Sequence, residues 1–167
     1  MSDNKSIDIL KRAILLEHRG KALYESVSAK TSTQAVKELF TMLAEEENTH
    51  IDVLTKQLKA VAGSGRFDPG IVLPSEEPAK NSVLTEAIVK EISGAGYEAA
   101  VISAALEFEK NAVDFYSMQA EGAQSDQEKK LFLWLTNWEK DHMAMLAQID
   151  KEVMENIWYD NSFWPLD

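Results

Sequence analysis

The sequence contains two Glu-x-x-His motifs, one beginning at Glu47 and the other at Glu139, and a further glutamate lies 30 residues before each motif. Residues three apart on a helix share one face, so each motif directs a carboxylate and an imidazole the same way. Oxygen-rich ligation with one histidine per metal suits iron or manganese better than zinc. The candidate metal ligands are Glu17, Glu47, His50, Glu109, Glu139 and His142.

These motifs belong to an internal repeat with an offset of 92 residues. A tyrosine follows each upstream glutamate by seven residues, at Tyr24 and Tyr116. One Glu-x-x-His arises easily by chance in an acidic helix, whereas two inside a repeat are a specific signal. The repeat predicts two copies of one helical hairpin. Its matching apolar pairs are Leu39 and Leu131, Phe40 and Phe132, Leu43 and Leu135, and Leu54 and Leu146.

Apolar residues recur at the i, i+3, i+4, i+7 spacing of amphipathic helices in four long stretches. They predict helices over about 6–29, 33–60, 97–121 and 126–156, the last opened by a capping box of Ser125 and Glu128. Glycine and proline gather between about 62 and 80, and a shorter helix is expected over about 82–92. We therefore expect an all-α, four-helix bundle of two antiparallel hairpins, joined by a long crossover (about 62–96) containing a short extra helix.

The candidate ligands lie within the apolar stripes of their helices. Glu17 follows Leu10 and Ile14 at helical spacing, and His50 precedes Leu54 by four residues. Burying an unpaired carboxylate costs on the order of tens of kcal/mol in the simplest continuum picture. Lysine and arginine do not occupy these stripes in matching number, so two divalent cations are the expected counter-charge.

Composition narrows the function classes. The chain has 167 residues, a net charge of -11 and no cysteine. The acidic balance argues against nucleic acid or a membrane surface as partner, and the missing thiols exclude disulfides, iron–sulfur clusters and a rubredoxin-type iron site. The first residues lack the apolar run of a signal peptide, so we expect a cytoplasmic protein. We expect one domain over 1–156 and an aromatic-rich C-terminal tail over 157–167.

Four segments together resemble the ferritin-like di-iron carboxylate superfamily, and most closely its rubrerythrin-related branch without a rubredoxin domain. They are LEHRGKALY (16–24), EEENTHIDVL (45–54), FEKNAVDFY (108–116) and WEKDHMAML (138–146). The resemblance implies that Tyr24 and Tyr116 hydrogen-bond near the carboxylates. They are the candidate catalytic residues, and plain core packing with a satisfied hydroxyl is the alternative. The resemblance also implies the ligand roles: Glu17 and Glu109 on one metal each, Glu47 and Glu139 bridging, and His50 and His142 capping the two metals.

One position departs from typical rubrerythrins, which carry an extra glutamate one turn after the third-helix ligand. Here Ala112 stands in that place, and Glu107 points about 200° away from Glu109 around the helix. The ligand set is therefore symmetric, as in bacterioferritin. The methionine that binds haem in bacterioferritin is replaced by Asn48, so no haem is expected.

The resemblance implies reduction of hydrogen peroxide or dioxygen at two iron ions, with manganese as the alternative metal. Electrons would come from an external donor such as a rubredoxin-like protein or a flavoprotein, and the chain would form a homodimer or a larger homo-oligomer. Three other functions remain open at this point: a ferroxidase feeding iron storage, a manganese catalase, and an accessory or scaffold protein whose metal is structural.

The remaining polar and aromatic residues have simpler interpretations. Glutamates 25, 45, 46 and 107 are predicted to face solvent, and His18 is predicted to lie on the surface. Trp134 and Trp138 are predicted to belong to the bundle core. The tail aromatics are expected to pack over the bundle or over a second subunit, and docking of a redox partner or another protein is the alternative. They are Trp158, Tyr159, Phe163 and Trp164.

Overall fold

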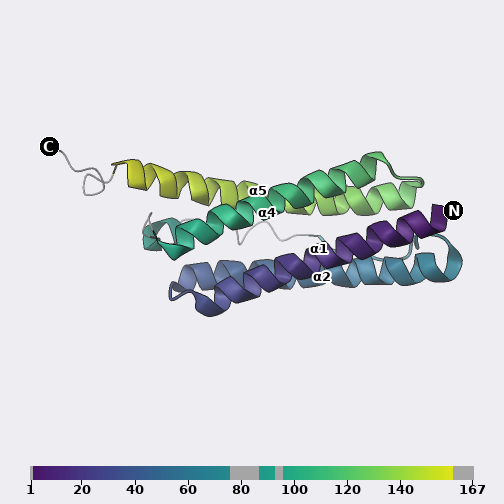
Figure 1. Ribbon diagram of the computed structural model, residues 1–167, viewed down its shortest axis with the longest axis horizontal. Coiled ribbons are helices and arrows are strands. Elements are labelled where there is room, and N and C mark those ends of the chain that lie inside the picture. The colour runs from purple at the N-terminus through teal and green to yellow at the C-terminus, as the bar shows by residue number, and fades with distance from the viewer. Residues whose placement is uncertain (1, 76–86, 93–95, 160–167) are drawn as a thin grey trace.

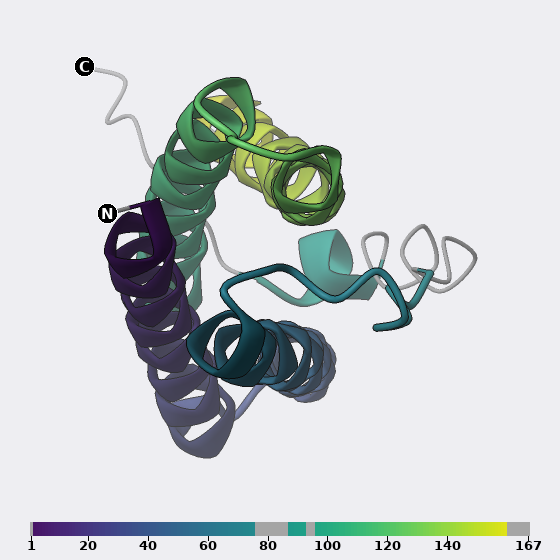
Figure 2. The same cartoon turned by 90° about the vertical axis from the view of Figure 1, so that its right-hand side faces the viewer.

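The computed structural model describes residues 2–75, 87–92 and 96–159. Its long helices are α1 (Ser2–Lys30), α2 (Gln34–Ser64), α4 (Tyr97–Glu121) and α5 (Asp126–Tyr159). Helices α1 and α2 form one antiparallel hairpin, and α4 and α5 form the other (Figure 1). The hairpins lie side by side, with α1 against α4 (Figure 2). The predicted all-α bundle of two hairpins is confirmed.

The helix ends follow local chemistry more closely than the apolar pattern does. Helix α2 runs four residues past its predicted end and stops at Gly65, whose φ of 70° is left-handed and whose N–H donates to the Val61 carbonyl. Such a glycine is the usual C-terminal stop of a helix. At the start of α5, the predicted capping box forms with one difference. The Glu128 N–H donates to Ser125 Oγ at 3.2 Å, but the Glu128 carboxylate accepts from the Gln124 N–H at 2.7 Å.

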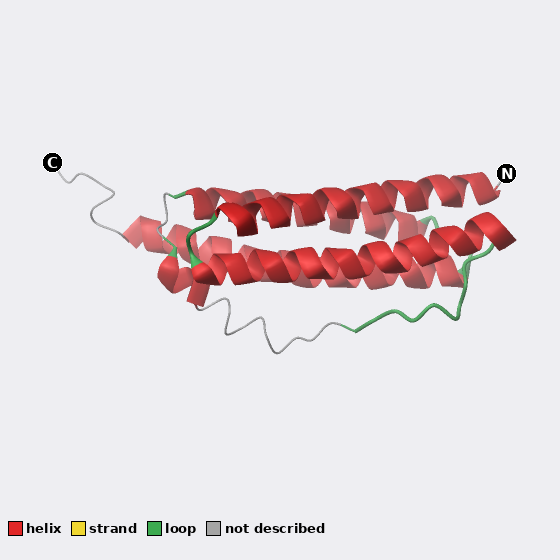
Figure 3. Ribbon diagram, turned by 90° about the horizontal axis from the view of Figure 1, so that it is seen from below, coloured by secondary structure: helices red, strands yellow, loops and turns green. Residues whose placement is uncertain are grey.

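The described first part of the crossover, residues 65–75, runs along the bundle on the side of α2 and α5 (Figures 2 and 3). Two side chains hold this part. The Gln57 amide donates to the Asp68 carbonyl at 3.0 Å and accepts from the Asp68 N–H at 2.9 Å, and the Trp134 indole donates to the Pro74 carbonyl at 2.8 Å. Residues 87–91 are helical and place Ile88 in the core. The short helix predicted over 82–92 is thus present in its second half, while 82–86 lie outside the described residues.

A layer of polar residues divides the hydrophobic core into two clusters. One cluster includes Tyr24 and Phe40, and the other includes Leu10 and Phe132. The six candidate ligands occupy the gap between the clusters along all four helices. Apolar packing above and below therefore fixes the position of this polar layer. None of the helices in the described ranges has a stretch long and apolar enough to cross a membrane.

The predicted C-terminal tail begins inside a helix. Helix α5 continues through Trp158 and Tyr159, whose side chains are 68% and 79% exposed. Both side chains are largely exposed in the single chain, and packing of the tail over the bundle or over a second subunit stays a prediction. Phe163 and Trp164 lie outside the described residues.

Candidate metal centre

The structure brings all six candidate ligands into one buried cluster, each at most 2% exposed. Their ligand atoms form two overlapping groups, within each of which all atoms lie no more than 4.8 Å apart. Glu47 and Glu139 belong to both groups and so lie at the centre. The first group adds Glu17 and His50, and the second adds Glu109 and His142.

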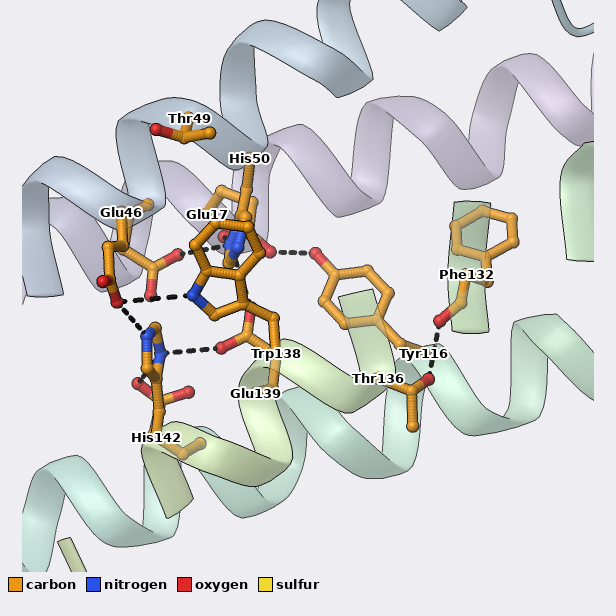
Figure 4. A network of polar contacts seen from close by, with 12 residues as sticks. Glu17, Glu46, Thr49, His50, Tyr116, Phe132, Thr136, Trp138, Glu139 and His142 are labelled. Carbon is orange, nitrogen blue, oxygen red and sulfur yellow. Dashed lines mark hydrogen bonds and ion pairs between the residues drawn. The ribbon is translucent and has the colours of Figure 1, made fainter. Parts of the chain in front are cut away.

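Both imidazoles turn the same ring nitrogen toward the carboxylates. His50 Nδ1 lies 3.1 Å from Glu17 Oε2 and 3.1 Å from Glu139 Oε1. His142 Nδ1 lies 3.2 Å from Glu139 Oε2 and 3.4 Å from Glu109 Oε1. Figure 4 shows both rings around Glu139. The Nδ1 atoms are therefore the ones placed to bind a metal, and the Nε2 atoms face outward.

The two predicted tyrosines tie the hairpins together through this cluster. The Tyr24 hydroxyl on α1 donates to Glu109 on α4, and the Tyr116 hydroxyl on α4 donates to Glu17 on α1. Both rings are fully buried. Burial raises the pKa of each phenol, and the nearby carboxylates raise it further, so both phenols stay protonated donors. Their observed role is to orient the two outer carboxylates, and a role in catalysis stays a prediction.

We expect Tyr116→Phe to lower the free energy of unfolding by about 1–3 kcal/mol, because it leaves a buried Glu17 oxygen without its donor. Metal affinity is expected to fall as well, since Glu17 then loses one of the contacts that orient it, another being His50 Nδ1. Denaturant unfolding and metal titration would measure both effects. Tyr97→Phe is the matched control, because the Tyr97 side chain is 46% exposed. Equal behaviour of the two variants would contradict the orienting role.

Several carboxylate oxygens in the cluster have no hydrogen-bond partner among the described residues. They are Glu47 Oε1 and Glu109 Oε2, which also lack an ion pair within the described ranges, and Glu139 Oε1, whose neighbour is His50 Nδ1 at 3.1 Å; all three are inaccessible to solvent. In the part of the chain that the structure describes, the ion-pair partners of the cluster glutamates are the two histidines. An unpartnered buried carboxylate oxygen is costly, and a divalent cation removes that cost. The donor set therefore fits metal binding.

Burial also shifts the proton affinities of two of these carboxylates. It raises the pKa of Glu109 to about 8, with the charge of Glu139 adding to the effect. It raises the pKa of Glu47 well above the usual range, and the charges of Glu17 and Glu139 add to that shift. Without metal, both groups favour the protonated form near neutral pH. Metal binding must therefore release protons.

Glu139 behaves in the opposite way. Burial alone would raise its pKa, but the two imidazoles beside it, His50 and His142, lower the pKa below the usual range. The same contact raises the pKa of His50, because attraction to Glu139 and Glu17 outweighs the effect of burial. In the metal-free protein, Glu139 is thus the ionised partner that both imidazoles share.

Glu46 is a site residue that the sequence analysis missed. It was predicted to face solvent, and the structure shows this to be wrong: the side chain is 21% exposed and accepts hydrogen bonds from His142 Nε2 and, at 3.3 Å, from Trp138 Nε1. Burial alone would raise the pKa of Glu46, but the hydrogen bond and charge of His142 lower it. The only sequence signal was its place beside the motif, 92 residues before Trp138.

Other predictions about the surroundings hold. Glutamates 25, 45 and 107 and His18 are exposed. Trp138 is buried, and Trp134 is partly buried against the core. Ala112 is buried where typical rubrerythrins carry the extra glutamate, so the cluster keeps its symmetric set of four glutamates and two histidines.

A bundle of two helical hairpins around a buried cluster of four glutamates and two histidines defines the ferritin-like class of carboxylate-bridged metal proteins. Within that class, the rubrerythrin family model matches residues 8–150, and the chain belongs to the rubrerythrin family. Family and cluster together support a di-iron protein.

Among solved structures, the chain is similar to a hypothetical protein from Pyrococcus furiosus, with 23% identity, a TM-score of 0.62, and coverage of 93% of this chain and 94% of that one. This similarity shows the shared fold alone. A comparison with curated proteins finds no match.

Proposed function

We propose that this protein is a non-haem di-iron oxidoreductase that reduces hydrogen peroxide. The observation that carries the proposal is the pair of overlapping buried ligand groups that share Glu47 and Glu139. Membership of the rubrerythrin family supports iron as the metal and peroxide as the oxidant. Manganese is the alternative metal, and dioxygen is the alternative oxidant.

The chain supplies one histidine and one outer glutamate to each metal position. Glu17 and His50 would hold one ion, Glu109 and His142 would hold the other, and the two shared glutamates would contact both. When bound, two Fe(II) ions supply the two electrons that, with two protons, convert hydrogen peroxide into two molecules of water. Anionic carboxylates favour the rise in metal charge that accompanies this oxidation.

The surrounding residues keep this centre dry and ordered. The hydrophobic clusters on either side exclude bulk water from the polar layer. The phenols of Tyr24 and Tyr116 hold the outer carboxylates in place and keep protons within the centre. The sequence contains no cysteine, so electrons for the next cycle would come from a separate donor such as a rubredoxin-like protein or a flavoprotein.

The proposal is tested by stopped-flow oxidation of protein loaded anaerobically with two Fe(II) per chain. One equivalent of hydrogen peroxide is expected to oxidise both ions, and to do so faster than dioxygen does. Glu139→Ala, which lacks a shared carboxylate, provides the control for iron in solution. Bound Fe(II) that stays reduced in the presence of peroxide would contradict the proposal and would favour a structural metal.

A ferroxidase that feeds iron storage is a second candidate, favoured by one observation: buried Ala112 leaves the ligand set symmetric. It predicts faster oxidation by dioxygen and uptake of iron well beyond two ions per chain. It also requires a shell-forming oligomer, whereas the peroxidase that we propose needs only a homodimer, although a larger homo-oligomer is also compatible with it. Light scattering of the purified protein would separate the two.

A further inference from the structure

The repeat that makes the six ligands symmetric does not extend to the residues behind the histidines. With the offset of 92 residues, Glu46 corresponds to Trp138, and Met42 corresponds to Trp134. A carboxylate and a thioether in one half of the repeat are thus replaced by two indoles in the other half. The two histidines consequently have different neighbours.

On its side away from the cluster, His142 belongs to a hydrogen-bonded chain with Glu46 and Trp138. Its outer nitrogen, Nε2, donates to Glu46 Oε2, and the same oxygen accepts from the Trp138 indole N–H at 3.3 Å (Figure 4). A carboxylate on the outer nitrogen of a histidine places the ring proton there, which leaves the lone pair on the inner nitrogen. For His142 that inner nitrogen is Nδ1, which faces Glu109 and Glu139.

Behind His50 the arrangement is apolar. Its outer nitrogen, Nε2, is buried and has no hydrogen-bond partner among the described residues. The rings of Trp134 and Trp138 stand nearly perpendicular to the imidazole, with centroids 5.3 and 4.8 Å away. Indole rings in this position restrict rotation of the imidazole ring. They offer no hydrogen-bond acceptor, so they cannot fix the ring proton on Nε2 as a carboxylate does.

We propose that Glu46 is a positioning residue that makes the two metal positions unequal, with the position of Glu109 and His142 binding metal first and more tightly. Trp138 donates a hydrogen bond to Glu46 and packs its ring against His50. The same side chain therefore contributes to the different surroundings of both histidines. This inference rests on the proposed metal centre, but it requires only that the centre binds metal and not that it reduces peroxide.

The test is an anaerobic titration of the metal-free protein with Co(II), followed by its visible absorption and by calorimetry. Wild type is expected to bind two ions in two resolved steps. Glu46→Gln keeps the size of the side chain and removes its charge, and it is expected to weaken the tighter step about 10- to 100-fold, the usual cost of losing such a partner. Glu45→Gln, the same change at the exposed neighbouring residue, is expected to leave both steps unchanged.

Two backgrounds assign the effect to one position. In Glu17→Gln the intact position is that of Glu109 and His142, and adding Glu46→Gln should weaken the remaining Co(II). In Glu109→Gln the intact position is that of Glu17 and His50, and adding Glu46→Gln should change its affinity little. Circular dichroism would establish that each variant is folded.

The outcomes separate the two proposals. Equal affinities in wild type, or an equal effect of Glu46→Gln in both backgrounds, would overturn the assignment of Glu46. Two unequal Co(II) sites together with no reaction between bound Fe(II) and peroxide would support Glu46 and defeat the peroxidase. A wild-type protein that binds no metal would overturn both.

Discussion

Glu139→Gln is expected to destabilise the metal-free protein at pH 7, and Glu47→Gln is expected to stabilise it, although both remove a carboxylate shared by the two ligand groups. Glu139 lies 3.1 Å from His50 Nδ1 and 3.2 Å from His142 Nδ1, and it is the ionised partner of both. Removing one member of a buried ion pair leaves an uncompensated charge, which typically costs about 3–5 kcal/mol. A loss of that size is expected in denaturant unfolding with a chelator present.

Glu47 differs from Glu139 because its surroundings disfavour the ionised carboxylate. Burial and the charges of Glu17 and Glu139 hold its pKa well above the usual range, so the protonated form is favoured at pH 7. Glutamine has nearly the shape of a protonated glutamate and keeps a donor for Glu17. The substitution therefore removes the cost of keeping Glu47 protonated above the ordinary pKa of a glutamate, a cost that grows by about 1.4 kcal/mol for each pH unit above that value.

Metal binding distinguishes the loss of a metal ligand in Glu47→Gln and Glu139→Gln from a change in stability alone. Both variants are expected to lose tight binding of two ions, because each lacks a ligand common to both groups, so metal should no longer raise their unfolding midpoints. Glu45→Gln serves as the charge-matched control. If both variants changed stability in the same direction without metal, the assigned charge states of Glu47 and Glu139 would be wrong.

The candidate ligands were predictable because their spacing along the sequence identifies them. A glutamate in an apolar stripe, repeated 92 residues later with Glu-x-x-His motifs at matching positions, leaves few arrangements in which all six side chains are buried together. The bundle follows from the same repeat. Family membership then agrees with the structure over residues 8–150.

Glu46 was not predictable by this reasoning, because its position is set by contacts between hairpins. Next to Glu47 on the helix it lies about 100° off the buried face, so the pattern of its own helix assigns it to solvent. Its long side chain reaches His142 and Trp138 on α5. The end of α2 was missed for a local reason: Gly63 is helical, and only Gly65 adopts the left-handed φ that ends the helix.

The pH dependence of stability gives the second large effect. The metal-free protein is expected to lose stability as the pH rises from about 5 to about 8. The pKa of Glu109 is raised by burial from 4.5 to about 8, so the stability that its protonated form contributes is present below 4.5 and lost as the pH passes 8. The pKa values of Glu47, His50 and His142 are also raised, and these groups act in the same direction. The pKa of Glu139 is lowered, so its contribution is lost only in acid.

Bound metal reverses this trend, because it replaces the protons on the ligands and binds more tightly as they ionise. The difference in Tm between metal-loaded and metal-free protein should therefore widen between pH 5.5 and pH 8.5. The loss without metal should be on the order of a few kcal/mol, since several groups contribute with one sign. Thermal unfolding at both pH values, with Mn(II) or with a chelator, would measure both quantities.

Glu109→Gln should flatten the pH dependence of Tm in the metal-free protein, because glutamine cannot ionise. A metal-free Tm that rises over this range would show that the cluster carries fewer protons than its burial requires.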